Sequence, residues 1–320
     1  MSDHWTHHPS GYRNVFFATI VLNASLLVSL FVGSAQAQHS SGTSTLPDLS
    51  GMAWVEDDVF IGVHDAKRNG EKDNLPRLSL VHLPKSKLEG VTWQSLDLTF
   101  PGPAGPSSDL ESASNIPGSK AFLFAESGQD DKSAPRIFLA VYDQDTLKIE
   151  SYLDWPVSIE NVEAIAVCQI DQQLVFIYAE RADSRPSTKL KWATLTLNPF
   201  KLGKFDEITY QGVDPVGNGA RPIVALDVDS EGFIYIVSAY DSGSDDGPYR
   251  SVVWRIGKIT GDENGIPRVD LSEAKRLATL DGLKVESIVV RELPEESKQI
   301  YIGTDDEHYG GIIRLLPDAL

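Results

Sequence analysis

The chain has 320 residues and a formal net charge of −18 at pH 7, with 46 acidic against 28 basic residues. A protein this acidic is not expected to bind nucleic acid or an anionic membrane surface. It has one cysteine, Cys168, so an intramolecular disulfide is excluded, and its place in an apolar run favours a buried thiol over a nucleophile.

Residues 1–37 are predicted to be a secretory signal peptide. Arg13 precedes an apolar run over residues 15–32, and "GSAQA" follows it with an A-x-A cleavage site at Ala35 and Ala37. The run is long for a signal peptide, so an uncleaved membrane anchor is the alternative. Residues 38–320 are then expected to form one exported domain in the periplasm or outside the cell, in contact with a membrane only if the leader remains.

Five segments repeat one plan, a short strand of small residues, a polar turn and a strongly apolar strand that ends in an acidic residue. They span residues 49–67, 110–128, 162–181, 223–241 and 285–307. Aligned on Ser50, Glu111, Glu163, Val224 and Glu286, the copies are 61, 52, 61 and 62 residues apart. A repeat of this length built from short strands predicts stacked or ring-like units, each of which cannot bury its apolar face alone.

Each hairpin is followed by a third apolar run, such as "RIFLAVY" from Arg136, and in four copies by a fourth, more polar run, such as "LKIESYL". Four strands per copy with turn residues between them, and no long helical period, predict an all-β fold, a single β-propeller of five four-stranded blades. The fifth copy ends after its third run. We expect the mature N-terminal segment 38–48 to supply the missing strand, because soluble proteins avoid an open sheet edge.

In a propeller the first strand of each blade lines the central channel, and the loops before it and after the second strand open on one face. Each copy therefore brings its first-strand position and the acidic residue after its second strand to one mouth of the channel. These pairs are Ser50 with Asp65, Glu111 with Glu126, Glu163 with Glu180, Val224 with Asp241, and Glu286 with Asp305. Eight carboxylates are expected around this opening.

Carboxylates so close together raise one another's pKa unless a positive charge lies among them. One source of that charge is Ca²⁺ or another hard divalent cation. The other is the basic residue that opens the third run in four copies: Arg77, Arg136, Lys189 and Arg250. Local pairing with these basic residues is the simpler explanation for four acidic residues: Asp65, Glu126, Glu180 and Asp241. If they are not paired in this way, these four residues are candidates for ligand binding, together with Asp305 and Arg181.

Glu111, Glu163 and Glu286 have no such repeated basic partner. We predict that they bind a metal ion or act as acid and base toward a ligand. His64, next to Asp65, is the candidate catalytic base, although a histidine at a strand end is more often structural. The chain contains no G-x-S-x-G, P-loop or H-E-x-x-H motif.

Three stretches, "DLESASNIPGSKAFLFAESG", "NVEAIAVCQIDQQLVFIYAER" and "KVESIVV", resemble the glutamate-bearing repeats of exported β-propellers called esterase-like activity of phytase, and those of related SdiA-regulated-type propellers. The resemblance covers most of residues 46–316. It implies hydrolysis of an ester or phosphate ester, often with calcium, and it places Glu111, Glu163 and Glu286 at the recurring glutamates. Ser50 and Val224 depart from that pattern, and a basic cluster for phytate is not evident.

Two functions stay open at this point. One is a cation-dependent phosphoester or ester hydrolase, in which Arg181 holds an anionic part of the substrate. The other is a non-catalytic propeller of the cell envelope that binds a small molecule or an envelope partner at the acidic mouth. A monomer is expected in either case.

Overall fold

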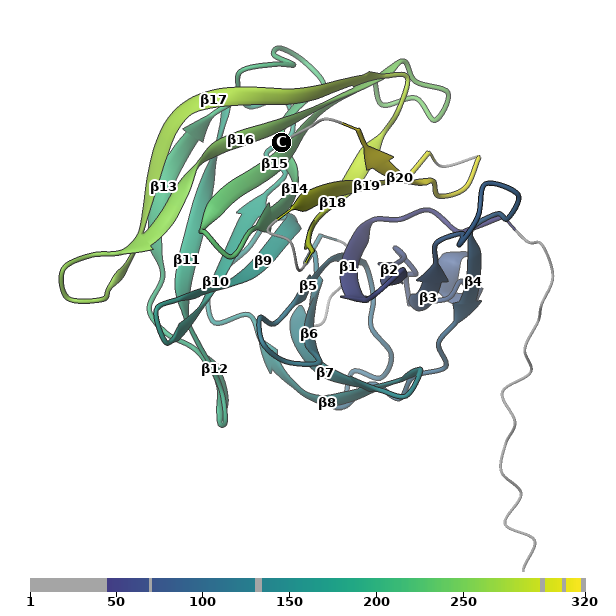
Figure 1. Cartoon of the computed structure of the whole chain (residues 1–320), viewed down its shortest axis with the longest axis horizontal. Coiled ribbons are helices and arrows are strands. Elements are labelled where there is room, and N and C mark those ends of the chain that lie inside the picture. Colours follow the sequence, from purple (N-terminus) through teal and green to yellow (C-terminus); the bar gives the residue numbers. More distant parts are fainter. Residues whose placement is uncertain (1–44, 69–70, 130–133, 294–296, 307–308, 318–320) are drawn as a thin grey trace, which may run out of the picture. The chain divides into compact units, whose positions relative to one another are not determined.

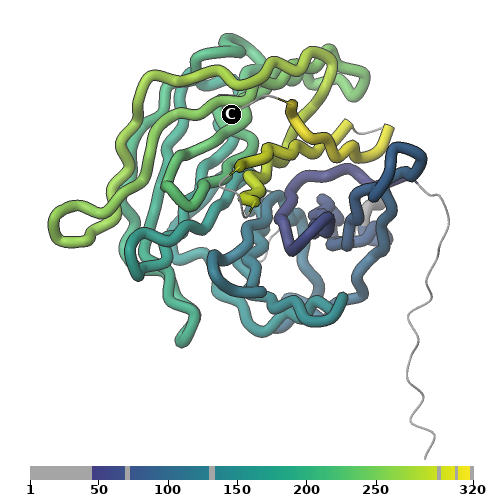
Figure 2. The backbone as a smooth tube through the Cα atoms, in the orientation of Figure 1, coloured from purple at the N-terminus to yellow at the C-terminus, as the bar shows by residue number. Residues whose placement is uncertain are grey.

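A computed structural model describes residues 45–68, 71–129, 134–293, 297–306 and 309–317. Within these residues the fold is all-β, with antiparallel strands and one 3-10 helix, Glu71–Asn74. The strands form five sheets around a common centre (Figures 1 and 2), which confirms the predicted five-bladed propeller. The leader predicted over residues 1–37 lies outside the described residues.

The first two blades each have four strands in sequence order from the centre outward. Blade 1 consists of β1 (Gly51–Glu56), β2 (Val59–Val63), β3 (Leu78–His82) and β4 (Thr92–Ser95). Blade 2 consists of β5 (Leu110–Asn115), β6 (Ala121–Glu126), β7 (Arg136–Asp143) and β8 (Thr146–Asp154).

The other blades keep this order with local changes at their outer edges. Blade 3 has β9 (Val162–Ile170), β10 (Gln173–Glu180) and β11 (Ser187–Leu197), and its fourth strand is divided into β12 (Phe200–Leu202) and β13 (Asp206–Gln211). Blade 4 has β14 (Ala220–Val228), β15 (Phe233–Asp241), β16 (Tyr249–Gly261) and β17 (Pro267–Asp281). Blade 5 has β18 (Val285–Glu292), β19 (Lys298–Thr304) and β20 (Ile313–Leu316).

The innermost strands form the ring. Strands β1, β5, β9, β14 and β18 each contact the next, and β18 contacts β1. The ring is tight, because a Cβ atom placed on Gly51 in β1 would lie 2.8 Å from the Cα atom of Ser112 in β5. Small residues at the start of these strands therefore allow the close approach that narrows the central channel.

Alternation of side chains along each strand holds neighbouring blades together. In β10, Val175 and Ile177 belong to the apolar cluster shared with blade 4, whereas Phe176 and Tyr178 belong to the cluster shared with blade 2. Five such clusters fill the five contacts between blades. Both faces of an inner hairpin are thus buried, which explains its nearly continuous apolar sequence.

The two ends of the ring meet beside blade 5. The backbone N–H of Leu49 donates to the carbonyl of Thr304 at 2.8 Å, and the N–H of Gly311 donates to the carbonyl of Leu46 at 2.7 Å. The segment that leads into blade 1 is therefore hydrogen-bonded to the last blade. Residues 45–48 are not a strand, and 38–44 lie outside the described residues, so a fourth strand of blade 5 from this segment stays a prediction.

Within the described residues no helix has the length and apolar character needed to cross a membrane.

Candidate functional site

The three predicted glutamates share one position in the fold. Glu111, Glu163 and Glu286 are each the second residue of an innermost strand, β5, β9 and β18. In blade 2, Leu110 pairs with Glu126 and Ser112 pairs with Ala125, so Glu111 has no cross-strand partner. The same irregularity leaves Glu163 and Glu286 unpaired in their own blades. A β-bulge of this kind turns a side chain away from the regular pleat, and it recurs in each blade that carries the glutamate.

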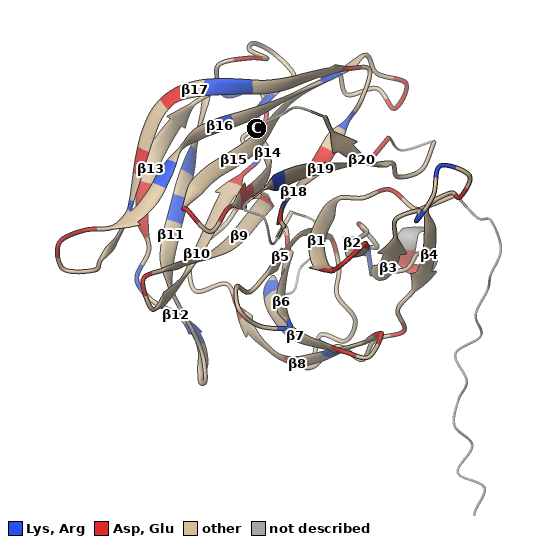
Figure 3. Ribbon diagram, viewed as in Figure 1, with Lys and Arg blue, Asp and Glu red and all other residues tan. Residues whose placement is uncertain are grey.

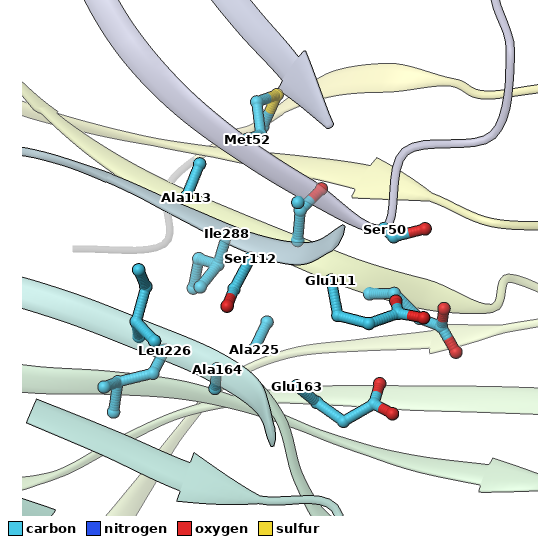
Figure 4. Close-up of a pocket in the computed structure, with 14 residues that line it drawn as sticks. Ser50, Met52, Glu111, Ser112, Ala113, Glu163, Ala164, Ala225, Leu226 and Ile288 are labelled. Atoms are coloured by element: carbon cyan, nitrogen blue, oxygen red, sulfur yellow. The ribbon is translucent and has the colours of Figure 1, made fainter. Parts of the chain in front are cut away.

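The bulged glutamates converge at one end of the central channel. One carboxylate oxygen of each lies within 4.8 Å of an oxygen of the other two. The residues are nearly enclosed, with exposed fractions of 9% for Glu111, 3% for Glu163 and 4% for Glu286. In Figure 4, Glu111 and Glu163 extend in the same direction, toward the end of the strands where Ser50 lies. The predicted convergence of these carboxylates is present in the structure.

Two of the three glutamates have cations of the protein beside them. Arg181 Nη1 lies 3.0 Å from Glu163 Oε1. Arg221 Nη1 lies 3.2 Å from Glu286 Oε1, and Lys284 Nζ lies 3.5 Å from the same atom. All three of these ion pairs involve the Oε1 atom of the carboxylate.

Glu111 differs from the other two. In the described part of the chain it has no ion pair, and no hydrogen bond reaches its carboxylate. Burial raises its pKa well above the ordinary value, and the charges of Glu163, Asp109, Asp65 and Glu286 raise it further. Burial also raises the pKa of Glu163, but Arg181 and Arg221 oppose the increase. A buried carboxylate without a cation is costly to ionise, so Glu111 is the residue that most needs an added positive charge.

A second acidic group adjoins the first and shares Glu111 with it. Oxygens of Asp65, Asp109 and Glu111 lie within 4.8 Å of one another. Lys67 Nζ lies 3.1 Å from Asp109 Oδ1 and 3.9 Å from Asp65 Oδ2. The hydroxyl of Ser127 donates to the other oxygen of Asp109. The mouth thus contains two adjoining carboxylate groups, and acidic residues also recur on loops around the ring (Figure 3).

The channel between the glutamates is very small. Its lining includes Glu111, Glu163, Glu286, Ser112 and Ser287, and the volume open to the centre of a water-sized sphere is about 10 Å³. That volume corresponds to about one water molecule. An organic substrate does not fit between the glutamates, so any larger ligand has to lie outside them, across the mouth.

Two predicted ligand-binding residues are held by outer strands of their own blades. Glu126 is buried and forms hydrogen bonds of 2.7 and 3.2 Å with the guanidinium of Arg136 in β7, as the pattern of repeated basic residues predicted. Glu180 pairs with Lys191 at 3.3 Å, although Lys189 was the expected partner, and Lys189 pairs with Glu207. The structure thus places both carboxylates in structural ion pairs of blades 2 and 3.

The remaining predicted residues do reach the glutamates, through shared cations. Asp241 lies 2.9 Å from Arg221, not beside Arg250 as expected, and Asp305 lies 4.0 Å from Lys284. Arg250 instead pairs with Asp214 and Asp281. Arg181, predicted to bind an anionic group, contacts Glu163 and Asp183, each at 3.0 Å.

His64 is fixed inside blade 1. Its Nδ1 donates to the carbonyl of Asp48 at 2.7 Å, and its Nε2 accepts from the hydroxyl of Ser79 at 2.9 Å. Burial lowers its pKa to about 4, so the ring is neutral at pH 7. Because both ring nitrogens are occupied, we do not retain His64 as the catalytic base. Cys168 is a buried thiol whose pKa burial raises to about 12, so the structural interpretation of this residue holds.

Sequence reasoning missed four residues of the mouth, Lys67, Asp109, Arg221 and Lys284. Three of them lie two positions from a predicted acidic residue: Lys67 from Asp65, Asp109 from Glu111, and Lys284 from Glu286. Residues at i and i+2 of an extended chain share one face, and that spacing was a usable signal. Arg221 gave no such signal, because it precedes the irregular stretch of blade 4 in which Val224 replaces the glutamate.

The three glutamates fit a hard divalent cation. Two oxygens bound to one Ca²⁺ at about 2.4 Å cannot lie more than about 4.8 Å apart, and carboxylate oxygens are its preferred ligands. Glu163 Oε1 accepts no hydrogen bond from any described group despite the nearby guanidinium, and Glu111 has no ion pair with a described residue. Both carboxylates are therefore able to accept a further positively charged partner.

No family profile matches this sequence, and no match was found among curated protein sequences. Solved structures share its fold. A thermostable family-43 glycoside hydrolase superposes with a TM-score of 0.51 and 10% identity, over 88% of this chain and 94% of the other. An endo-arabinase from Bacteroides thetaiotaomicron superposes with a TM-score of 0.50 and 9% identity, over 86% and 95%. At such identity the likeness supports the five-bladed propeller and nothing about substrate.

Proposed function

We propose that this protein is an exported, monomeric hydrolase that binds Ca²⁺ or another hard divalent cation at the channel mouth and cleaves a phosphoester or carboxylic ester there. The observation that carries the proposal is Glu111, a buried carboxylate that has no ion pair with a described residue and converges with Glu163 and Glu286. Cation binding by this trio is the first step of the argument, and hydrolysis is the second.

A bound divalent cation supplies a Lewis acid for a phosphoryl or carbonyl oxygen and lowers the pKa of a coordinated water. Glu111, Glu163 and Glu286 would hold it through their carboxylate oxygens. Arg181 and Arg221 keep Glu163 and Glu286 in place, and their planar guanidinium groups suit an anionic part of a substrate. The narrow channel limits the substrate to the outer side of the glutamates, so only its reacting group would approach the cation.

The sequence resemblance to the esterase-like activity of phytase gives the reaction class in this proposal. Two solved structures with the same fold are named as a family-43 glycoside hydrolase and an endo-arabinase. That observation is compatible with hydrolysis at a propeller mouth but does not favour a glycoside over an ester. The convergence of the glutamates favours a cation-dependent reaction over one that uses a protein nucleophile.

The second candidate is a non-catalytic propeller that binds a cation together with a small molecule or an envelope partner. One observation favours it. His64, a histidine next to the predicted site residue Asp65, has both ring nitrogens hydrogen-bonded, so neither nitrogen is free to act as a base.

The two candidates differ in turnover. The purified protein is melted with and without Ca²⁺, Mg²⁺ and Mn²⁺, and assayed with p-nitrophenyl phosphate, a phosphodiester and an aryl acetate. Metal-dependent turnover that disappears in Glu111→Gln, but not in Glu150→Gln on the exposed outer strand β8, supports the hydrolase. A metal-dependent rise in melting temperature without turnover supports the binding protein. Absence of both effects refutes both candidates.

A further inference from the structure

We infer that the mouth binds two divalent cations, and that Glu111 bridges them. The first cation is the one proposed between Glu111, Glu163 and Glu286, on which this inference rests. The second lies between Glu111, Asp65 and Asp109. The second group is built from two blades, because Asp65 follows β2 of blade 1 and Asp109 precedes β5 of blade 2.

The geometry of the second group matches that of the first. Oxygens of Asp65, Asp109 and Glu111 lie within 4.8 Å of one another, the largest separation that one Ca²⁺ spans. Asp109 is only 2% exposed. Its Oδ2 accepts from Ser127, but its Oδ1 accepts no hydrogen bond from a described group and has Lys67 Nζ 3.1 Å away.

Glu111 is the independent observation that points to a ligand. Its side chain is more than nine-tenths buried, has no ion pair or hydrogen bond within the described residues, and contributes an oxygen to both groups. A carboxylate has two oxygens with about four lone-pair sites, so it can bind two cations at once. Two-metal sites with cations about 3.5–4 Å apart are built around shared ligands of this kind.

Carboxylates outnumber cationic side chains among the described residues of the mouth. Among the described residues, four cationic side chains share ion pairs with seven carboxylates, and Glu111 is an eighth carboxylate. The cationic residues are Lys67, Arg181, Arg221 and Lys284. The carboxylates they contact are Asp65, Asp109, Glu163, Asp183, Asp241, Glu286 and Asp305. This described part of the mouth is therefore expected to attract divalent cations.

Lys67 distinguishes the second position from the first. Its ammonium lies beside both Asp65 and Asp109, where the second cation would bind, and its side chain is 32% exposed. A long, partly exposed lysine can move aside at the cost of two ion pairs. The second cation therefore competes with Lys67 and binds more weakly than the first, so two classes of affinity are expected.

Calcium titration of the purified protein by isothermal calorimetry tests this arrangement. The wild type should bind two Ca²⁺ with different affinities. Asp65→Asn should lose the weaker one and change the affinity of the tighter one less than about three-fold. Glu111→Gln should lose both. Lys67→Gln, which removes the competing ammonium, should tighten the weaker site about ten-fold, which a purely structural role of the cluster would not produce.

A spectroscopic measurement tests the bridge directly. Two Mn²⁺ ions held by one carboxylate should give a spin-coupled EPR signal in the wild type and an isolated Mn²⁺ signal in Asp65→Asn. If Asp65→Asn does not fold, Asp109→Asn is the second variant. Asparagine tolerates the φ of +60° at position 109. One bound Ca²⁺ in the wild type, with no effect of Lys67→Gln, overturns the two-cation inference and leaves the proposed function standing. No calcium binding at all refutes the proposed function as well.

Discussion

Replacing Glu111 with glutamine tests the cation site most sharply. The substitution keeps the shape of the side chain and removes a carboxylate that forms no ion pair with a described residue. Burial and the charges of four neighbouring carboxylates raise the pKa of this group. We therefore expect the metal-free Glu111→Gln protein to be more stable than the wild type, although a buried residue is changed.

The size of this gain is bounded by pH. A glutamate of the unfolded chain ionises near 4.5. Because the folded pKa is raised, folding carries a penalty that grows as pH rises above that value. Each pH unit adds about 1.36 kcal/mol, so the penalty is at most about 3 kcal/mol at pH 7 and below about 1 kcal/mol at pH 5. Glu111→Gln should accordingly gain about 1–3 kcal/mol at pH 7 and little at pH 5.

Calcium should stabilise the wild type and not the variant. At a Ca²⁺ concentration about 100 times Kd the wild type gains about 2.7 kcal/mol. For a domain of this size the gain corresponds to a rise in Tm of roughly 5–10 °C. The variant should show no rise. The assay is a thermal melt of both proteins with and without Ca²⁺, with Glu150→Gln as the control. A variant that keeps the full calcium shift, or that is less stable than the wild type without calcium, refutes the argument.

Four further results are expected. Glu163→Gln should gain less stability without metal than Glu111→Gln, measured by urea denaturation, because Arg181 and Arg221 offset part of the effect of burial on Glu163. Arg136→Met should lose about 3–5 kcal/mol because it orphans the buried Glu126, yet calorimetry should show unchanged calcium affinity. Burial raises the pKa of Asp227 from 3.8 to about 7, so between pH 4 and 7 only the folded state holds this proton, and the free energy of unfolding should fall as pH rises through that window. Urea titrations at several pH values should show that this fall is smaller by about 1–4 kcal/mol in Asp227→Asn. His64→Gln should lower Tm but leave the pH profile of metal-dependent turnover unchanged, and an altered profile would restore His64 as a base.

The five-bladed fold could be read from the sequence because its period and its alternation are local properties. In β10, Ile177 and Tyr178 are neighbours in sequence that pack against different blades, and an apolar hairpin with two buried faces leaves few alternatives to a ring of sheets. The five copies then fixed where each inner strand begins. Glu111, Glu163 and Glu286 followed, because all three occupy one position of the repeat.

The ion pairs of the mouth could not be read in the same way. Arg250 and Lys189 open their third runs as Arg136 does, but only Arg136 contacts the acidic residue of its own hairpin. The partner of a long side chain depends on strand register and on which neighbour is closer, and a shift of one residue reverses the direction of the side chain. The bulges at the glutamates are such shifts, and they leave no mark in the repeat pattern.

The two blades without the glutamate give the mouth its direction. A ring with five buried glutamates would carry two more negative charges beside Glu111, Glu163 and Glu286, which would raise the pKa of each of them further. Blade 4 has Val224 at this position and contributes Arg221 to the mouth, and blade 1 has Ser50, whose buried hydroxyl donates to Asp305. One side of the opening is therefore rich in carboxylates without enough cations, and the other presents guanidinium groups. An ester with an anionic group would meet bound cations at one end and arginine at the other, which orients it before any reaction begins.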